Sequence, residues 1–501
     1  MIKNKIKKVI GLIVFLCLLG TVYARITYLF RNNNWEQQHI NGMKNEDSLD
    51  VVCVGGSSTF VYWEPFLAWN EFGMTSYNFA TASARPAIMK GYVKEAVERA
   101  NPDLVVIDMR CYANGAIDVE KLTDAEGGIR NMTDSLDLNV NRLIAVNDVM
   151  RFYNAFKDDS VDPWSFYFDI AKYHTNYAQL GVEDNWKHLN NGNYESPYKG
   201  FEFITFAYHD FVNEPVDYKT DEVTELNPTV KESLIDLLEY LSKNDIEALF
   251  VAGPIPVNKG TQALYNCIGE TVGDYGYNFL NTNDYYEEMG TDFSKDFYNS
   301  GHVNVYGAEK YTRFVSEYIK ANYEIDDHRS EDEFSEWDEF FNVSHEQDLI
   351  FKDTIDKLIA EKNVAFEKGK NLKTIESFEE WVRDANDTNF TVIAVAKGAV
   401  PDISSPWNVT TGTQNIIRVY TAGTAIAEFD SEQAEDYSAT IGTHSVPIVI
   451  NSGDKAKVTI SGIELSMDDE GLYYIAFDNN YNQILDCIYL SNSNEMKHVY
   501  Q

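Results

Sequence analysis

The longest run of apolar residues lies at the N-terminus. Residues 9–24 are uncharged and almost wholly apolar, and the basic run KNKIKK precedes them. Continued through Arg25 to Phe30, this stretch would form a helix of about 33 Å, enough to cross the roughly 30 Å hydrocarbon core of a membrane. The pattern predicts a single transmembrane anchor within residues 1–31, with the lysines in the cytoplasm and the body of the chain outside it.

A cleaved signal peptide is the alternative for this segment. Val22-Tyr23-Ala24 resembles a small-residue cleavage site, whereas the apolar run ITYLF that follows Arg25 favours a retained helix. Both interpretations place the body of the chain outside the cytoplasm, and the retained helix places it at the cell membrane.

After the anchor, short β-branched runs alternate with stretches of helical spacing. The strand-like runs are 50–54, 102–109 and 246–252, and the helix-like stretches are 89–99, 230–242 and 303–323. This alternation predicts an α/β fold over residues 48–325, with a mostly parallel sheet and helices on both of its faces. In such sheets, binding sites form beyond the carboxyl ends of the strands.

Three other regions depart from the α/β pattern. Residues 140–225 are rich in Trp, Tyr and Phe, and we interpret them as an insertion that covers the sheet or a substrate cleft. Residues 326–370 are acidic with bulky apolar residues interspersed, which favours a helical arm. From 371 to 501, short strand-like runs separated by Gly, Asn and Asp predict a small β-rich domain.

The charge and the cysteines narrow the classes of partner and cofactor. The chain has 41 Lys and Arg against 79 Asp and Glu, a net charge of -38. A body this acidic repels nucleic acid, which we therefore exclude as a partner. The five cysteines are widely separated and show no metal-ligand spacing. We therefore expect no metal site, no cofactor and no disulfide framework.

A serine in a glycine turn is the first candidate for chemistry. Gly55-Gly56-Ser57-Ser58 follows the strand predicted at 50–54 and precedes a helix-compatible stretch. A serine placed there points out of the sheet edge, and nearby amides such as that of Gly56 can stabilise an oxyanion. No Gly-Lys-Ser/Thr sequence follows, which disfavours a nucleotide-binding loop.

A histidine far downstream is the second candidate. The segment Asp296-Phe-Tyr-Asn299-Ser-Gly-His302 leads into the helix predicted at 303–323. A serine nucleophile needs an imidazole base, and the imidazole needs an acceptor for its other N–H. Asn299, three residues before His302, is the predicted acceptor, and Asp296 is the rival.

Together, these residues resemble the SGNH/GDSL hydrolase superfamily over about residues 48–337. Within it the chain looks similar to the DltD-like, membrane-anchored branch linked to teichoic-acid D-alanylation and polysaccharide O-acetylation. The resemblance implies a flavodoxin-like α/β fold with Ser57 as nucleophile and His302 as base. It places the family's second block on Asn78-Phe79-Ala80, with Ala80 where the oxyanion glycine usually stands.

Two positions depart from the family pattern. Asn299 stands where the family has an acid, and an asparagine does not stabilise an imidazolium by charge; in serine proteases the Asp-to-Asn change costs about 10⁴ in rate. The family's third-block asparagine is also missing, and Arg110 and Asn114 are the candidates to replace it as oxyanion donors.

The motifs and the resemblance together imply a membrane-anchored, extracytoplasmic serine O-acyl esterase or acyltransferase. Its substrate would be a cell-surface glycan or teichoic-acid-like polymer, or an acyl-carrying donor, and a membrane-bound acyltransferase is an implied partner. The alternative is a catalytically silent protein of the same fold that binds or helps assemble surface polysaccharide.

Overall fold

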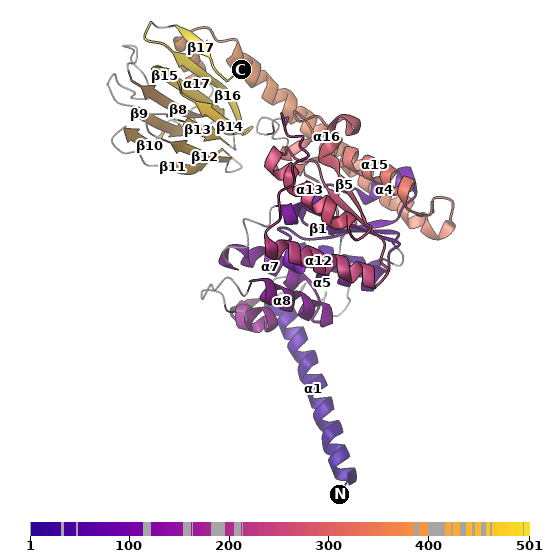
Figure 1. Cartoon of the computed structure of the whole chain (residues 1–501). Helices are drawn as coiled ribbons and strands as arrows, with labels where there is room; N and C mark the ends of the chain where they lie inside the picture. The colour runs from indigo at the N-terminus through magenta and orange to yellow at the C-terminus, as the bar shows by residue number, and fades with distance from the viewer. Residues whose placement is uncertain are drawn as a thin grey trace. The chain divides into compact units, whose positions relative to one another are not determined.

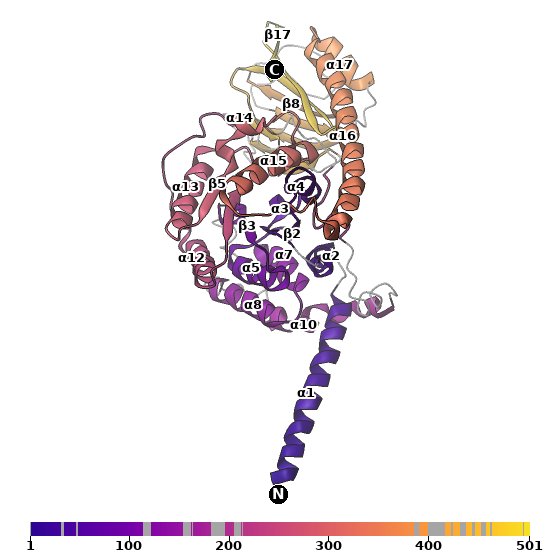
Figure 2. The same ribbon diagram turned by 90° about the vertical axis from the view of Figure 1, so that its right-hand side faces the viewer.

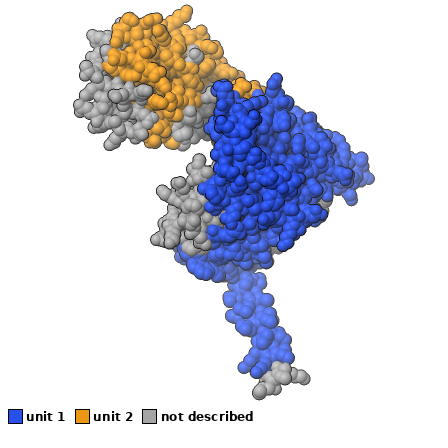
Figure 3. Space-filling view, viewed as in Figure 1, with its two compact units in different colours: residues 1–204, 215–291, 301–349 blue, residues 205–214, 292–300, 350–501 orange. Residues whose placement is uncertain are grey.

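The computed structural model divides the chain into two compact units (Figures 1 and 3). The first unit comprises residues 1–204, 215–291 and 301–349, and the second comprises 205–214, 292–300 and 350–501. The residues that the structure describes are 2–31, 35–46, 49–113, 122–153, 162, 164–181, 196–204, 212, 214–384, 390–398, 416–421, 424–430, 437–442, 446–451, 457–460, 463–493 and 495–500.

The first unit begins with one long apolar helix, α1 (Ile2–Phe30). Its stretch Lys5–Phe30 is long and apolar enough to cross a membrane, with a mean hydropathy of 2.3. Residues 5–22 are exposed, and α1 extends away from the rest of the unit (Figure 2). The prediction of a single N-terminal helix that could span a membrane is therefore confirmed for the described part of the chain.

A five-stranded parallel sheet forms the centre of the first unit, in the order β2-β1-β3-β4-β5. The strands are β1 (Val51–Gly55), β2 (Ser76–Ala80), β3 (Leu104–Asp108), β4 (Ala248–Ala252) and β5 (Asn278–Asn281). Every residue of β1 to β4 is buried, as expected for a parallel sheet covered on both faces. The three strands predicted from apolar runs are present as β1, β3 and β4.

Helices flank this sheet, and several begin at a side-chain cap. The helices are α2 (Trp35–Gly42), α3 (Ser57–Phe60), α4 (Pro65–Phe72), α5 (Pro86–Ala100), α7 (Leu122–Ser135), α8 (Val140–Tyr153), α9 (Trp164–Tyr167), α10 (Ile170–Tyr173), α12 (Pro228–Lys243), α13 (Lys259–Gly273), α14 (Tyr286–Met289) and α15 (Val305–Asn322), with 3₁₀ turns η1 (Met43–Asn45), η2 (His174–Gly181), η4 (Thr282–Asp284) and η5 (Asp332–Phe334). Asn227, Asn258 and Asn304 cap α12, α13 and α15, each accepting a backbone N–H of the first turn. The helices predicted at 89–99, 230–242 and 303–323 correspond to α5, α12 and α15.

The pattern of apolar residues does not predict β2 or β5. β2 has the sequence SYNFA, in which Ser76 and Asn78 are fully buried. The amide of Asn78 donates to the carbonyl of Trp63 at 2.8 Å, so a partner from another segment makes the burial of this polar side chain possible.

The second unit is built from two antiparallel sheets. The six-stranded sheet has the order β10-β9-β8-β15-β16-β17, and the four-stranded sheet has the order β11-β12-β13-β14. The strands are β8 (Phe390–Lys397), β9 (Ile416–Thr421), β10 (Thr424–Asp430), β11 (Tyr437–Ile441), β12 (Val446–Asn451), β13 (Lys457–Ile460), β14 (Ile463–Ser466), β15 (Gly471–Asp478), β16 (Gln483–Leu490) and β17 (Met496–His498). One hydrophobic core contains residues of both sheets, for example Ile393 and Ile460. The prediction of a β-rich C-terminal region is confirmed.

Two helices precede these sheets. The acidic segment predicted as a helical arm forms α16 (Ser335–Lys370), and the boundary between the two units falls within this helix, between residues 349 and 350. α17 (Ile375–Asp384) buries Phe378 and Trp381, and the ring of Phe378 stacks on Tyr474 at 6.1 Å. Trp381 is therefore a packing residue of the second unit.

Candidate active site

Ser57 and His302 lie within hydrogen-bonding distance of each other. Ser57 is the first residue of α3, after the end of β1, and His302 begins the short strand β7 (His302–Val303). The Oγ of Ser57 lies 2.6 Å from Nε2 of His302, although 245 residues separate them in sequence. Both residues are half-buried. The structure thus brings together the serine and the histidine that the two sequence motifs single out.

The turn that carries Ser57 needs a glycine at position 55. A Cβ on Gly55, the last residue of β1, would lie 2.7 Å from the Cβ of Asp108, which is closer than side chains tolerate. Gly56 follows in an extended conformation, and its carbonyl accepts the N–H of Thr59 at 2.9 Å to begin α3. The close approach of β1 to the end of β3 therefore places Ser57 at the carboxyl edge of the sheet.

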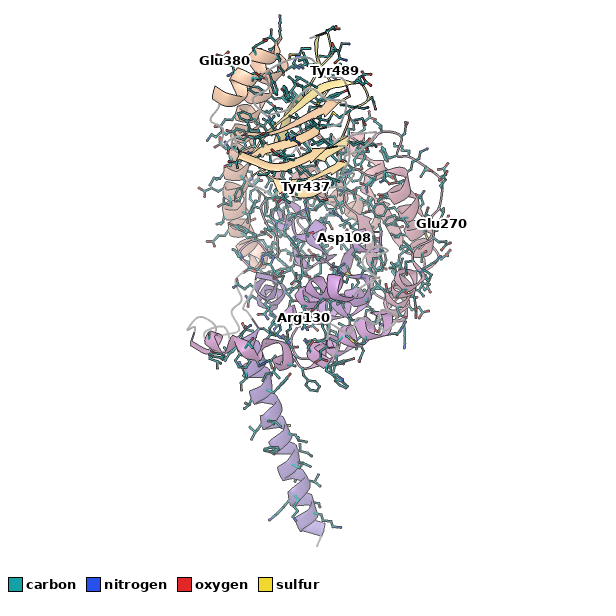
Figure 4. The ribbon with its side chains drawn as sticks, turned by 90° about the vertical axis from the view of Figure 1, so that its left-hand side faces the viewer. Asp108, Arg130, Glu270, Glu380, Tyr437 and Tyr489 are labelled. Atoms are coloured by element: carbon teal, nitrogen blue, oxygen red, sulfur yellow. The ribbon has the colours of Figure 1, made fainter. Side chains whose placement is uncertain are left out.

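Asp108, which is labelled in Figure 4, lies at the end of β3 and holds this turn in place through three hydrogen bonds. Its carboxylate accepts the hydroxyl of Ser58 at 2.6 Å and the backbone N–H of Arg110 at 3.3 Å. It also accepts the backbone N–H of Gly56. Burial raises the pKa of Asp108, and the hydrogen bond from Ser58 and the charge of Arg110 offset part of that rise. The amide of Gly56, predicted as an oxyanion donor, is thus directed at Asp108.

Arg110 contacts the segment that carries His302. Its guanidinium donates to the carbonyl of Gly301, and the hydroxyl of Tyr62 donates to the same carbonyl at 3.2 Å. Burial, together with the positive charge of Arg110, lowers the pKa of His302 to about 4. At neutral pH the imidazole is therefore uncharged, which is the state in which Nε2 can accept the proton of Ser57.

A polar cavity of about 190 Å³ opens beside Ser57. Ser57 and Ser58 line it together with three charged side chains, Arg85, Asp108 and Arg110. It is smaller than the roughly 300 Å³ or more of a typical drug-sized ligand site. A group of only a few heavy atoms, such as a short acyl chain, fits this volume.

The remaining predicted site residues are placed differently. Ala80 ends β2 and is fully buried, and the described lining of the cavity does not include it. Asn114 lies outside the described residues. Asn299 is half-buried at the end of β6 (Phe297–Asn299). Asp296, its rival as a partner of the imidazole, is buried and accepts the N–H of Asp292 at 2.7 Å, which stabilises a local turn.

Sequence reasoning missed Asp108, Ser58 and Arg85 as residues of this site. A signal for Asp108 was available, because an acid at the end of an otherwise apolar strand stands at the sheet edge where sites form. Arg85 and Ser58 carry no comparable signal, since their place beside the cavity depends on how α5 and α3 pack.

The described residues contain neither a candidate metal site nor a disulfide. No group of three or more His, Cys, Asp or Glu among the described residues could hold a metal ion. The five cysteines are free thiols, and burial raises the pKa of Cys53 well above its ordinary value.

The arrangement of Ser57 and His302 has the geometry of nucleophilic catalysis. A neutral imidazole at hydrogen-bonding distance can take the serine proton as the oxygen attacks an acyl carbon.

Comparison with models of known protein families and with curated protein sequences gives no match for this chain. The resemblance to the SGNH/GDSL superfamily therefore stays a prediction, and the serine–histidine geometry stands on its own.

Proposed function

We propose that this chain is a membrane-anchored, extracytoplasmic serine O-acyl esterase or acyltransferase of the SGNH/GDSL kind. It would act on a cell-surface glycan or a teichoic-acid-like polymer. The observation that carries the proposal is the 2.6 Å contact between Ser57 Oγ and an uncharged His302 Nε2, beside a small polar cavity.

The reaction follows from this geometry in two steps. The Oγ of Ser57 attacks the carbonyl carbon of an O-acyl ester while Nε2 of His302 takes the serine proton, and the imidazolium then protonates the leaving alkoxide. Water, or the hydroxyl of a sugar, then attacks the acyl-enzyme and regenerates Ser57. Water as the acceptor makes the protein an esterase, and a sugar hydroxyl makes it an acyltransferase.

Two groups are candidates to stabilise the negative oxygen of the tetrahedral intermediate. One is the positively charged side chain of Arg110, which lines the cavity. The other is the backbone N–H of Ser57, which is the first residue of α3 and also lines the cavity. Asn299 remains the proposed acceptor for the second N–H of His302. An amide in that role orients the ring without adding negative charge.

The anchor supports a surface substrate. With α1 in the membrane, the basic residues before it favour a cytoplasmic N-terminus and place the body outside. Protease added to intact protoplasts should then remove the body and leave the N-terminus intact. Anchoring also keeps the site near a membrane-bound acyl donor or acyltransferase partner, which raises the effective concentration.

Labelling with a fluorophosphonate tests the serine chemistry directly, because only an activated serine reacts readily. The full chain should be labelled, and Ser57→Ala and His302→Ala should each abolish the label. Ser242→Ala, an exposed serine of α12, serves as the matched control and should keep it. If the wild-type chain is not labelled, the alternative of a catalytically silent, polysaccharide-binding protein gains support.

A cellular measurement then tests the substrate class. The O-acyl content of the surface polymers should change in cells that lack the protein. Wild type should restore it, and Ser57→Ala should not. Restoration by Ser57→Ala would show that binding, not acyl transfer, is the function.

A further inference from the structure

The segment 164–181, part of which packs against α1, has four large apolar side chains that are exposed. These side chains are Trp164, Phe168, Tyr177 and Leu180, with exposed fractions of 65%, 52%, 72% and 39%, and we refer to the four together as the cluster. The rings of Trp164 and Phe168 stack at 6.3 Å. α10 and η2, which belong to the same segment, pack against α1, and Figure 2 shows α10 beside the end of that helix.

The junction between this segment and α1 is held by polar contacts, one part-buried and one buried. The amide of Asn176 donates to the carbonyl of Phe30 at 3.0 Å. Arg31 forms an ion pair with Asp169, and both side chains are buried. In the sequence, Asp169 stands between Phe168 and Tyr177. The cluster therefore has a fixed position relative to the last turns of α1.

The length of the free part of α1 places the cluster at membrane level. Val9–Val22 is the apolar part of α1 that stands clear of the body, and its roughly 14 residues span about 21 Å. The hydrocarbon core is about 30 Å thick, so residues beyond Val22 must make up the remaining 9 Å or so. From Tyr23 onwards, α1 is largely half-buried or buried by the body. If α1 crosses the membrane, the segment packed on its last turns must enter the membrane interface.

The charge of the segment fits that location. Residues 164–181 contain one acid, Asp169, and it is fully buried in ion pairs, whereas the whole chain has 79 acids in 501 residues. The segment is instead rich in Trp, Tyr and Phe, the residue types that gather at the boundary between lipid and water. Within residues 164–181, therefore, no acid is exposed, and the exposed acid nearest in sequence among the described residues is Asp162.

We infer that the cluster of Trp164, Phe168, Tyr177 and Leu180 is a second membrane contact, inserted into the interface of the leaflet from which α1 emerges. The molecules that cover this cluster are phospholipids. The inference rests on the membrane anchoring in the proposed function and is independent of the serine chemistry. Together with α1, this contact holds the first unit in one orientation on the membrane instead of leaving it free to swivel on a tether.

Depth-dependent fluorescence quenching on the full chain in phosphatidylcholine vesicles tests the inference. The less buried cysteines Cys17 and Cys111 are first replaced by serine, and an environment-sensitive fluorophore is attached at Phe168→Cys or Tyr177→Cys. The matched control is Val216→Cys, also an exposed apolar residue, at 84%. Its near neighbour Tyr218 contacts Tyr286 of α14, which Figure 2 shows at the end of the first unit away from α1.

Lipids carrying a nitroxide at a shallow position should quench the label at 168 and at 177 and leave the label at 216 unquenched. Iodide dissolved in the water should quench the label at 216 and leave the labels at 168 and 177 unquenched. If iodide quenches all three sites equally, the cluster lies in water and the inference is wrong. If 168 and 177 are shielded from iodide without lipid quenching, and the shielding falls as protein is diluted in lipid, a second copy of the chain covers the cluster, and this also overturns the inference.

The fluorescence of the native Trp164 side chain tests the same contact without an attached label. None of the chain's eight Trp residues lies in α1, so the intrinsic emission reports on the body. Shallowly brominated phosphatidylcholine should quench the wild type more than Trp164→Phe. Equal quenching of the two proteins would contradict insertion of Trp164.

Discussion

Two regions of the first unit bury charged side chains, and they do so in opposite ways. At the base of α1, Arg31 and Arg142 both pair with Asp169, and Arg142 also pairs with Asp134 at 3.2 Å. Burial alone would raise the pKa of Asp134, but the positive charges of Arg31, Arg142 and Arg130 outweigh it and keep that pKa below its ordinary value. Cations and anions thus alternate, and every charge has an opposite neighbour.

At the candidate active site, the charge that shifts the pKa of the histidine is positive. Arg110 is the charged group that acts on the pKa of His302, and it acts in the same direction as burial. Asp108, which lines the cavity, accepts hydrogen bonds from Ser58 and from the backbone of the turn that carries Ser57. Figure 4 shows the two regions apart in the first unit, with Asp108 marking one and Arg130 the other.

The difference shows what each region is suited to do. Matched buried ion pairs resist rearrangement, because removing one partner leaves another charge buried without compensation. At the site, burial and the positive charge of Arg110 keep the imidazole of His302 uncharged at neutral pH, the state in which its Nε2 can accept a proton. Charged side chains therefore stabilise the junction with α1 in one region and, through Arg110, help to set the protonation state of the reactive histidine in the other.

The largest expected effect is on the reactive region. Ser57→Ala and His302→Ala should each lower the hydrolysis of a small acyl ester by about 10³-fold or more, to the rate in buffer, because the two residues act as one unit. The thermal melting of both variants should match that of the wild type. Residual hydrolysis at the wild-type rate would exclude Ser57 as the nucleophile.

The next effect concerns the anchor region. Asp169→Ala leaves Arg31 and Arg142 buried without their shared partner and should lower the free energy of unfolding by about 3–5 kcal/mol. Lys357→Ala, which breaks an exposed pair with Asp353 on α16, should change it by less than about 1 kcal/mol. Calorimetry on the detergent-solubilised full chain gives both values. Equal effects would mean that the buried network does not stabilise the junction.

A smaller effect should appear in the pH dependence of the reactive region. Hydrolysis requires neutral His302, so the wild-type rate should fall as pH drops through about 4, where the imidazole gains a proton. Arg110→Gln removes the positive charge and should move this midpoint upward, towards the ordinary histidine value. Burial is the larger cause of the low pKa and remains, so the shift should be partial. An unmoved midpoint would show that Arg110 does not act on His302.

The smallest expected change is a gain. Asn299→Asp places a negative charge three residues before His302 and should favour the imidazolium formed during attack, raising ester hydrolysis by about tenfold, the equivalent of one pKa unit. Asp296→Ala is the comparison. If Asp296 is the true partner of the imidazole, its loss should be severe and Asn299→Asp should have little effect.

Much of the local structure follows from the order of residues alone. The apolar run after KNKIKK predicts α1, and β-branched runs predict β1, β3 and β4, because the periodicity of apolar residues is a property of neighbouring positions in the sequence. Ser57 and His302 are also visible in the sequence, since each occupies a short motif with its own turn residues. β2 and β5 escape detection because their buried polar residues depend on partners from other segments.

The tertiary structure decided which of these residues work together. Arg31 and Asp169 are 138 positions apart, and Ser58 and Asp108 are 50 apart, so no local pattern links them. The aromatic residues expected to cover the sheet or a cleft illustrate the same limit, because Phe166 and Phe201 are buried whereas Trp164, Phe168 and Tyr177 are exposed. Composition determines that a segment is apolar enough to be covered. Only the packing of distant segments determines whether protein or membrane covers it, because burial is a property of the whole fold.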